Sequence, residues 1–213
     1  MTKYFTNTYS VINLYKKASV NSEIVSQMIY GDNFRIIKKE NKWLRIRIKE
    51  DNYLGFIQHK NFKHYLKPTH KINKLKAKIY KSPNKQKKVN ELTYGSKIRV
   101  IDKKNEFLKF DTGWISKNET VPITYKEKNP FKQISIFKNI NYKWGGKSFN
   151  GIDCSALVQI FLNFNKRFCP RDAKDQVKYF KKNIKFKNIK KNDIIFWKGH
   201  VGIALSKKKL IHA

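Results

Sequence analysis

Three residues in the last third of the chain have types and spacing that suit covalent catalysis: Cys154, His200 and His212. A thiolate can attack a carbonyl carbon, and an imidazole can remove the thiol proton and later protonate the leaving amine. His200 suits that task, and the ring of His212 could hydrogen-bond the first imidazole and fix its tautomer. The set predicts a hydrolase that works through a thioester.

The nucleophile is expected at the start of a helix. From Cys154, apolar side chains follow at the spacing of one helix face; they are Leu157, Val158, Phe161 and Leu162. The unpaired N–H groups and positive dipole end of a helix N-terminus stabilise a thiolate, so we expect the Cys154 pKa below its ordinary value of about 8.5. The same N–H groups could hold the oxyanion formed when a carbonyl is attacked.

Both histidines are expected on neighbouring strands. An apolar strand over 194–197 is followed by a turn at Gly199, a second strand begins after His200, and a third, over 210–213, contains His212. Adjacent strands can carry both rings to one end of a sheet. The glycines of this part of the chain lie around Cys154 and His200, which indicates unusual backbone demands at both places.

Four short motifs surround these residues: Gly-Gly at 145–146, Gly-Ile-Asp-Cys-Ser at 151–155, Gly-His-Val-Gly at 199–202 and Ile-His-Ala at 211–213. With them, the chain from about residue 125 to 213 resembles the NlpC/P60 family of papain-like cysteine peptidases. The resemblance implies a helix packed on an antiparallel sheet, with Cys154 as nucleophile, His200 as general base and acid, and His212 as the orienting third member. It also implies that Tyr142 helps polarise the reacting carbonyl. The alternative for Tyr142 is a buried aromatic side chain.

The first half of the chain is a duplication. A shift of 64 residues aligns Tyr30-Gly31 with Tyr94-Gly95 and the strand-like segment at 34–37 with that at 98–101. Each copy has short half-buried strands that alternate with period two, which favours a small barrel and resembles a bacterial SH3 domain. The first copy has about six extra residues at Arg47–Asn52, expected as a longer hairpin loop.

The predicted fold is therefore multi-domain, with two β-barrels followed by an α+β domain. We expect SH3-like domains at 1–66 and 67–121 and a peptidase domain at 122–213. Family domains usually continue beyond the third catalytic residue, so the last domain is expected to be short at its C-terminus.

The resemblance to family members that carry N-terminal SH3 domains implies a substrate site. In those members an Asp and the Ser after the nucleophile contact the free amine of the substrate, which here are Asp172 and Ser155, and a Tyr of the first SH3 domain closes that end of the cleft. Tyr53 is the candidate for that Tyr, and Trp144 is a candidate for the pocket lining. The alternatives are a helix N-cap for Asp172 and simple packing for Trp144.

Two smaller departures concern the residues near these motifs. Ala156 stands where the family commonly has Gly, and Cys169, just before the Pro-Arg-Asp stretch, is expected to be a buried thiol without a role in catalysis.

The chain carries a formal charge of +33, from 48 Lys and Arg against 15 Asp and Glu, and Lys supplies nearly all of the excess. We favour codon bias of an AT-rich genome as the cause. Steering of an anionic ligand is a second interpretation, and specific nucleic-acid binding is disfavoured because Arg is scarce and Lys is spread along the chain. The sequence offers no cofactor motif and no cysteine spacing typical of a metal site.

The resemblance predicts a γ-D-glutamyl-L-diamino-acid endopeptidase that recycles short murein peptides with a free N-terminal L-Ala. Apolar runs are too short to cross a bilayer, and residues 1–10 lack the apolar segment of a secretion signal, so a cytoplasmic location is expected. One alternative is an exported murein hydrolase or amidase that acts on intact wall. The other is a basic SH3-pair binding module with an inactive peptidase domain.

Overall fold

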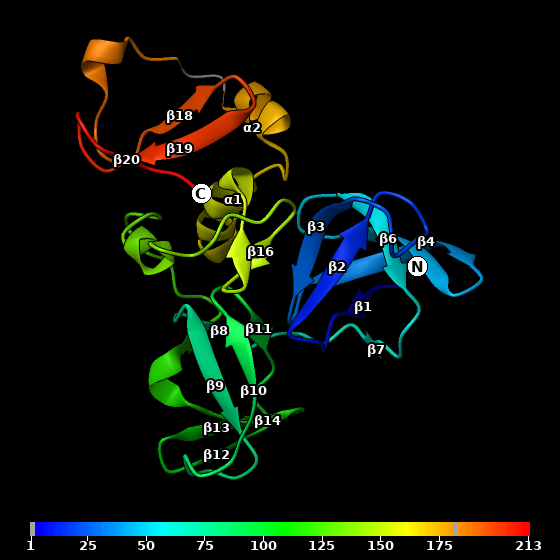
Figure 1. The fold of residues 1–213 in the computed structure, drawn as a ribbon. Helices are drawn as coiled ribbons and strands as arrows, with labels where there is room; N and C mark the ends of the chain where they lie inside the picture. The colour runs from blue at the N-terminus through cyan, green and yellow to red at the C-terminus, as the bar shows by residue number, and fades with distance from the viewer. Residues whose placement is uncertain (1–2, 181–182) are drawn as a thin grey trace. The chain divides into compact units, whose positions relative to one another are not determined.

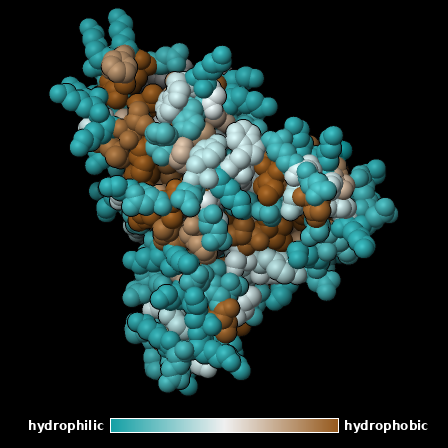
Figure 2. All heavy atoms as spheres, viewed as in Figure 1, coloured by the Kyte–Doolittle hydropathy of each residue, from teal (hydrophilic) through white to brown (hydrophobic). Residues whose placement is uncertain are grey.

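The computed structural model describes residues 3–180 and 183–213 and divides the chain into two compact units, 1–125 and 126–213. Each unit is described by itself, and Figure 1 labels the helices and strands of both. No helix among the described residues is both long and apolar enough to cross a membrane. Hydrophilic side chains cover most of the visible face of each unit (Figure 2), as expected for Lys spread along the whole chain.

The first repeat forms a seven-stranded antiparallel sheet with the order β3-β2-β6-β5-β4-β1-β7. Its strands are β1 (Phe5–Thr6), β2 (Val11–Tyr15), β3 (Ile24–Ile29), β4 (Asn33–Glu40), β5 (Trp43–Ile48), β6 (Leu54–Gln58) and β7 (Lys63–His64). The alternation in β5 works as predicted, because Leu44, Ile46 and Ile48 are buried whereas Arg45 is exposed.

The second repeat forms two smaller antiparallel sheets, with the orders β10-β9-β14-β13-β12 and β11-β8-β15. The strands are β8 (His70–Ile72), β9 (Lys76–Tyr80), β10 (Lys88–Thr93), β11 (Lys97–Ile98), β12 (Asp102–Lys104), β13 (Phe107–Phe110), β14 (Gly113–Ser116) and β15 (Thr120–Pro122). A 3-10 turn, η1 (Lys117–Glu119), precedes β15.

The strands of the two repeats correspond in order and pairing, which supports the duplication inferred from the sequence. The β2–β3 and β5–β6 pairs of the first repeat match the β9–β10 and β13–β14 pairs of the second. The β5–β6 hairpin is the longer one, with its last pair at Arg47 and Leu54, whereas Phe110 pairs with Gly113 in the second repeat. The extra residues of the first copy therefore lie in this hairpin, as predicted.

Each repeat has its own core, and one side chain joins them. The first core consists of Ile12, Leu14, Met28, Phe34, Leu44, Ile46, Ile48 and Ile57. The second is built from Ile72, Ala77, Ile79, Leu92, Ile98, Leu108, Phe110 and Ile115, and it also includes Tyr30 of the first repeat. The Tyr30 ring lies edge-on to Phe110, and its hydroxyl donates a hydrogen bond to Asp111.

Charged groups also connect the two repeats. Lys97 Nζ lies 2.6 Å from Glu50 and 3.3 Å from Asp32, and its side chain is only 18% exposed. The Lys97 backbone N–H donates to Tyr30 O at 2.9 Å. Gly31 adopts a φ of 84°, and a side chain there would collide with the Lys97 carbonyl, so the close approach requires glycine.

The second unit contains two helices and a three-stranded sheet. The helices are α1 (Cys154–Phe164) and α2 (Ala173–Tyr179), and the antiparallel sheet has the order β18-β19-β20, with β18 (Ile194–Trp197), β19 (His200–Ala204) and β20 (Leu210–Ile211). A short pair, β16 (Lys147–Ser148) and β17 (Gly151–Ile152), precedes α1, and 3-10 turns lie at η2 (Ile134–Phe137) and η3 (Phe186–Asn188).

Helix α1 is the centre of this unit and packs on β19. The side chains predicted to form its apolar face, Leu157, Val158, Phe161 and Leu162, are all buried. The Phe161 ring lies 5.7 Å from that of Phe137 and 6.3 Å from that of Phe131. A largely buried helix against a sheet gives a rigid base for whatever lies at its first turn.

Candidate active site

Cys154 is the first residue of α1, as the apolar spacing predicted. Asp153 is the N-cap, in the extended conformation, and its Oδ1 accepts a hydrogen bond from the Ala156 N–H at 2.8 Å. An Asp in this position satisfies one of the otherwise unpaired N–H groups and fixes where the helix begins. Cys154 is buried, with 6% of its surface exposed.

The thiol lies beside the start of β19, because the Val201 backbone N–H hydrogen-bonds to its sulfur. Burial raises the pKa of Cys154 above its ordinary value, and the charge of Asp153 raises it further, whereas the N–H groups of Val201, Ser155 and Cys154 itself lower it. The expected decrease of this pKa is therefore wrong in direction. The helix terminus acts as predicted, but desolvation and the neighbouring carboxylate outweigh it.

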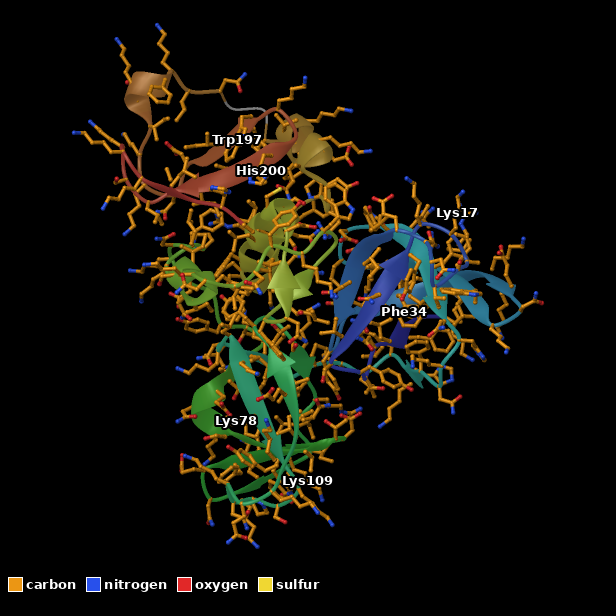
Figure 3. All side chains as sticks on the ribbon, viewed as in Figure 1. Lys17, Phe34, Lys78, Lys109, Trp197 and His200 are labelled. Atoms are coloured by element: carbon orange, nitrogen blue, oxygen red, sulfur yellow. The ribbon has the colours of Figure 1, made fainter. Side chains whose placement is uncertain are left out.

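The two histidines come together as predicted. Nε2 of His200 lies 3.0 Å from Nδ1 of His212, and their ring centroids are 5.0 Å apart. Trp197 on β18 packs against both rings, at 4.7 Å from His200 and 5.8 Å from His212. Figure 3 labels Trp197 and His200 on their adjoining strands. Nδ1 of His212 also lies 3.2 Å from the Ala213 carbonyl oxygen.

The electrostatics of His200 favour a neutral ring. Burial lowers its pKa, and the neighbouring His212 lowers it further, against opposing contributions from the Ala213 carbonyl and the charge of Asp153. A neutral imidazole at neutral pH is the form that can accept a proton from a thiol. Neutral His200 beside a protonated Cys154 is thus the resting state that this geometry favours.

Tyr142 faces the same place. It pairs with Ile152 through an isolated parallel bridge, and it is 50% exposed, so the alternative of a buried aromatic is wrong. Burial raises the pKa of its hydroxyl, and the charges of Cys154 and Asp153 raise it further. Its hydroxyl therefore stays protonated and is able to donate a hydrogen bond near the nucleophile.

The predicted substrate-binding residues have different surroundings. Ser155 is buried, and its Oγ donates to Asp153 Oδ1 at 3.1 Å and accepts from Arg171 Nη1 at 3.0 Å. Asp172 stands at the N-cap of α2, but its side chain makes no capping hydrogen bond. Trp144 is 61% exposed. Tyr53 belongs to the first unit, where its side chain packs partly buried against the first core.

Arg171 is a residue of this site to which the sequence analysis gave no role. It is 3% exposed and forms a buried, bidentate pair with Asp153, with Nη1–Oδ1 at 3.0 Å and Nη2–Oδ2 at 2.6 Å. A signal was present, since Arg171 is one of few Arg residues in a chain that otherwise uses Lys, and only Arg offers a planar fork for a carboxylate. Cys169, by contrast, is fully buried, as predicted.

The site is organic rather than metallic in composition. Over residues 3–180 and 183–213, no group of three or more His, Cys, Asp or Glu side chains is arranged to hold a metal ion. The groups that meet here are a thiol, an imidazole pair, a phenol and a carboxylate held by Arg171.

A buried thiol at the start of a helix, packed on a strand that begins with a histidine paired to a second histidine, defines a cysteine peptidase. The comparisons with known proteins agree with this class. Residues 139–213 match the model of the NlpC/P60 family, and residues 14–62 match the bacterial dipeptidyl-peptidase Sh3 domain. The chain belongs to the NlpC/P60 family of cysteine peptidases and carries a bacterial SH3 domain ahead of the peptidase domain.

Several curated relatives cover most of the chain. The dipeptidyl-peptidase 6 of Lysinibacillus sphaericus is 27% identical, over 94% of this chain and 84% of the relative. The gamma-D-glutamyl-L-lysine dipeptidyl-peptidase of Bacillus subtilis is 26% identical, over 89% of this chain and 72% of the relative. A probable endopeptidase of Haemophilus influenzae is 32% identical, over 45% of this chain and 70% of the relative.

The fold has a solved counterpart. A crystal structure of an NlpC/P60 family protein from Bacillus cereus superimposes with a TM-score of 0.82 at 17% identity, covering 98% of this chain and 90% of the other.

Proposed function

We propose that this protein hydrolyses the γ-D-Glu–diamino acid bond of short murein peptides that have a free N-terminal L-Ala. The observation that carries the proposal is the position of Cys154, at the start of α1 and bonded by the Val201 N–H, next to the pair formed by His200 and His212. That arrangement provides a nucleophile, a base and an orienting group within one domain.

In the proposed reaction, the Cys154 sulfur attacks the γ-carbonyl carbon of D-Glu while His200 takes up the thiol proton. The carbonyl oxygen becomes an oxyanion, which N–H groups of the first turn of α1 and the Tyr142 hydroxyl stabilise. His200 then gives its proton to the amine of the diamino acid, and the C–N bond breaks to leave a thioester. Water, deprotonated by His200, attacks the thioester and restores the thiol.

The substrate class rests on the family and on named relatives. Two of these, from Bacillus subtilis and Bacillus cereus, are called gamma-D-glutamyl-L-lysine dipeptidyl-peptidase. In this chain, Asp172 and Ser155 would meet the substrate ammonium, and Trp144 would line the pocket. The Ser155 hydroxyl has its proton and one lone pair engaged by Asp153 and Arg171, which leaves one lone pair to accept a hydrogen bond from an ammonium group.

Selection of short peptides would come from the SH3 part of the chain. We assign SH3-like barrels to 1–66 and 67–121 and a papain-like domain to 122–213, with Tyr53 closing the amine end of the cleft. A peptide still joined to glycan is then too large to enter, because the closed end accepts only a free N-terminus. This selectivity suits recycling of released peptides in the cytoplasm, and the basic surface would speed the arrival of their carboxylates.

The test compares two substrates and one variant. Wild-type protein and Cys154→Ala are incubated with L-Ala-γ-D-Glu-diaminopimelate, with the L-Lys analogue and with intact sacculi, each with and without EDTA. We expect wild-type protein to release the diamino acid from the tripeptide only, EDTA to leave the rate unchanged, and Cys154→Ala to lose turnover. Activity confined to sacculi, or turnover that survives the substitution, would overturn the proposal.

A further inference from the structure

The carboxylate of Asp153 acts on three candidate catalytic groups at once. Its charge raises the pKa of Cys154 and of Tyr142, and it raises that of His200 against the stronger effect of burial. The same carboxylate is the N-cap of α1. Asp153 therefore fixes the place of the nucleophile but opposes its ionisation, and its position and its charge have opposite consequences for the reaction.

Arg171 acts on both properties of Asp153. Its two terminal nitrogens contact both carboxylate oxygens, at 3.0 Å and 2.6 Å, and Nη1 also donates to Ser155 Oγ at 3.0 Å. The Arg171 side chain is 1% exposed and that of Asp153 is 8% exposed, so the pair is little screened by water. A planar fork fixes the orientation of a carboxylate as well as compensating its charge.

A separate contact holds the segment that carries Arg171. Gln176 on α2 donates from Nε2 to Ser155 O and to Pro170 O, both at 2.9 Å. The first turn of α1 and the residue before Arg171 are thus tied to one amide group. The guanidinium is delivered to Asp153 by an ordered backbone rather than by a long, freely moving side chain.

We propose that Arg171 is a positioning residue for the peptidase reaction, which holds Asp153 so that the first turn of α1 places Cys154 for attack and which compensates the Asp153 charge beside the nucleophile. The inference rests on the function proposed above. Arg171 need not touch the substrate in this role, because it acts through Asp153 and Ser155.

Other charged groups on the elements around α1 do not substitute for Arg171. They are Lys147 on β16, His200 on β19, His212 after β20, and Lys174, Asp175 and Lys178 on α2. The three charged residues of α2 are exposed, and Lys147 is buried on a different element. Among the contacts in the described part of the chain, the buried ion pair of Asp153 is the one with Arg171.

The test measures ionisation of the thiol without any substrate. Alkylation of Cys154 by iodoacetamide is followed against pH, with peptide mass spectrometry to separate Cys154 from Cys169. The variants are Arg171→Met, which removes fork and charge, Arg171→Lys, which keeps only the charge, and the double variant Arg171→Met/Asp153→Asn. Asn remains a good N-cap, so the double variant keeps the start of α1 and removes the unpaired carboxylate. Arg167→Met, at an exposed Arg in the same segment, is the matched control.

We expect Arg171→Met to raise the midpoint of alkylation by about one pH unit, with at least a tenfold loss of kcat on the tripeptide. In Arg171→Lys the midpoint should stay within about 0.3 units of wild type while kcat falls, because the charge remains and the fork is lost. The double variant should return the midpoint toward wild type, and Arg167→Met should match wild type in both measurements.

Two results would overturn the inference: a folded Arg171→Met protein with a wild-type midpoint and kcat, or a double variant whose midpoint stays as high as that of Arg171→Met. If Arg171→Met does not fold, the Arg171→Lys and double variants decide the matter by the same two measurements. Failure of the proposed function looks different, since the wild-type protein would then lack turnover of the tripeptide while the alkylation series would still respond to Arg171.

Discussion

Nε2 of His200 and Nδ1 of His212 lie 3.0 Å apart, on side chains that two neighbouring strands bring to the same end of the sheet. A neutral imidazole has one N–H and one unprotonated nitrogen. If His200 donates from Nε2 to His212, its Nδ1 is left unprotonated and can accept the proton of a thiol. The pair therefore decides which nitrogen of His200 is the base.

This relationship predicts a specific tautomer and a specific loss. In the wild-type protein near neutral pH, nitrogen NMR should show Nδ1 of His200 unprotonated and Nε2 protonated. His212→Ala should mix the tautomers and lower kcat about tenfold, the equivalent of one good hydrogen bond, while His212→Gln should recover part of the rate. A protonated Nδ1 on His200 in the wild-type protein would contradict the assigned roles.

The pKa shifts predict the pH dependence of catalysis. Burial and His212 lower the pKa of His200 below 6.5, and the reaction needs the neutral ring, so kcat/KM should rise with pH through a midpoint below 6.5 and then level off near neutrality. Burial raises the pKa of Cys154 above 9.0, so alkylation of Cys154 in the absence of substrate should increase through an alkaline midpoint. A thiolate already formed at about pH 5, as in papain, would show that the proton has moved to His200 in the resting enzyme.

The sequence predicted those parts of the site that follow from local pattern. The start of α1 at Cys154 could be inferred because the apolar side chains after it lie on one helix face and are indeed buried. The strands that bear His200 and His212 could be inferred because both segments are short, apolar and separated by turns. Period and punctuation carry enough information for such elements.

The direction of the Cys154 pKa could not be obtained in this way. A helix N-terminus is visible in a sequence, but the burial of the thiol and the field of Asp153 depend on how the whole domain packs. The same holds for Tyr30, which the repeat pattern places in the first copy and the structure places in the core of the second. Contacts between distant segments leave no periodic trace.

The core behind the nucleophile predicts a large effect on stability. Phe161 is fully buried in α1 and contacts the rings of Phe131 and Phe137. Phe161→Ala should lower the free energy of unfolding of the second unit by about 3–5 kcal/mol, from lost burial and the cavity left behind. Phe186→Ala, at a side chain 85% exposed, is the control and should change it by less than about 0.5 kcal/mol. Urea unfolding measures both, and equal effects would show that α1 is not the centre of this core.

The ion cluster between the repeats predicts a second, electrostatic contribution to stability. Lys97 lies within 3.3 Å of both Asp32 and Glu50, and the Asp32 side chain is only 4% exposed. Burial lowers the pKa of Lys97, but the charges of Glu50 and Asp32 outweigh it and hold the pKa above its ordinary value of 10.5. Lys97→Met would leave buried carboxylates unpaired and should destabilise the first unit by about 3 kcal/mol.

The pH dependence of that loss follows from the sign of the shift. Because the folded-state pKa is raised, the contribution of Lys97 is fully present below the unfolded value and is lost only as pH rises through the folded value. The difference between wild type and Lys97→Met should therefore be constant from about pH 6 to pH 9, with Lys97 protonated in both the folded and the unfolded chain. Lys16→Met removes an exposed pair with Glu23 and should cost less than about 1 kcal/mol. A Lys97→Met protein as stable as Lys16→Met would mean that the cluster does not hold the repeats together.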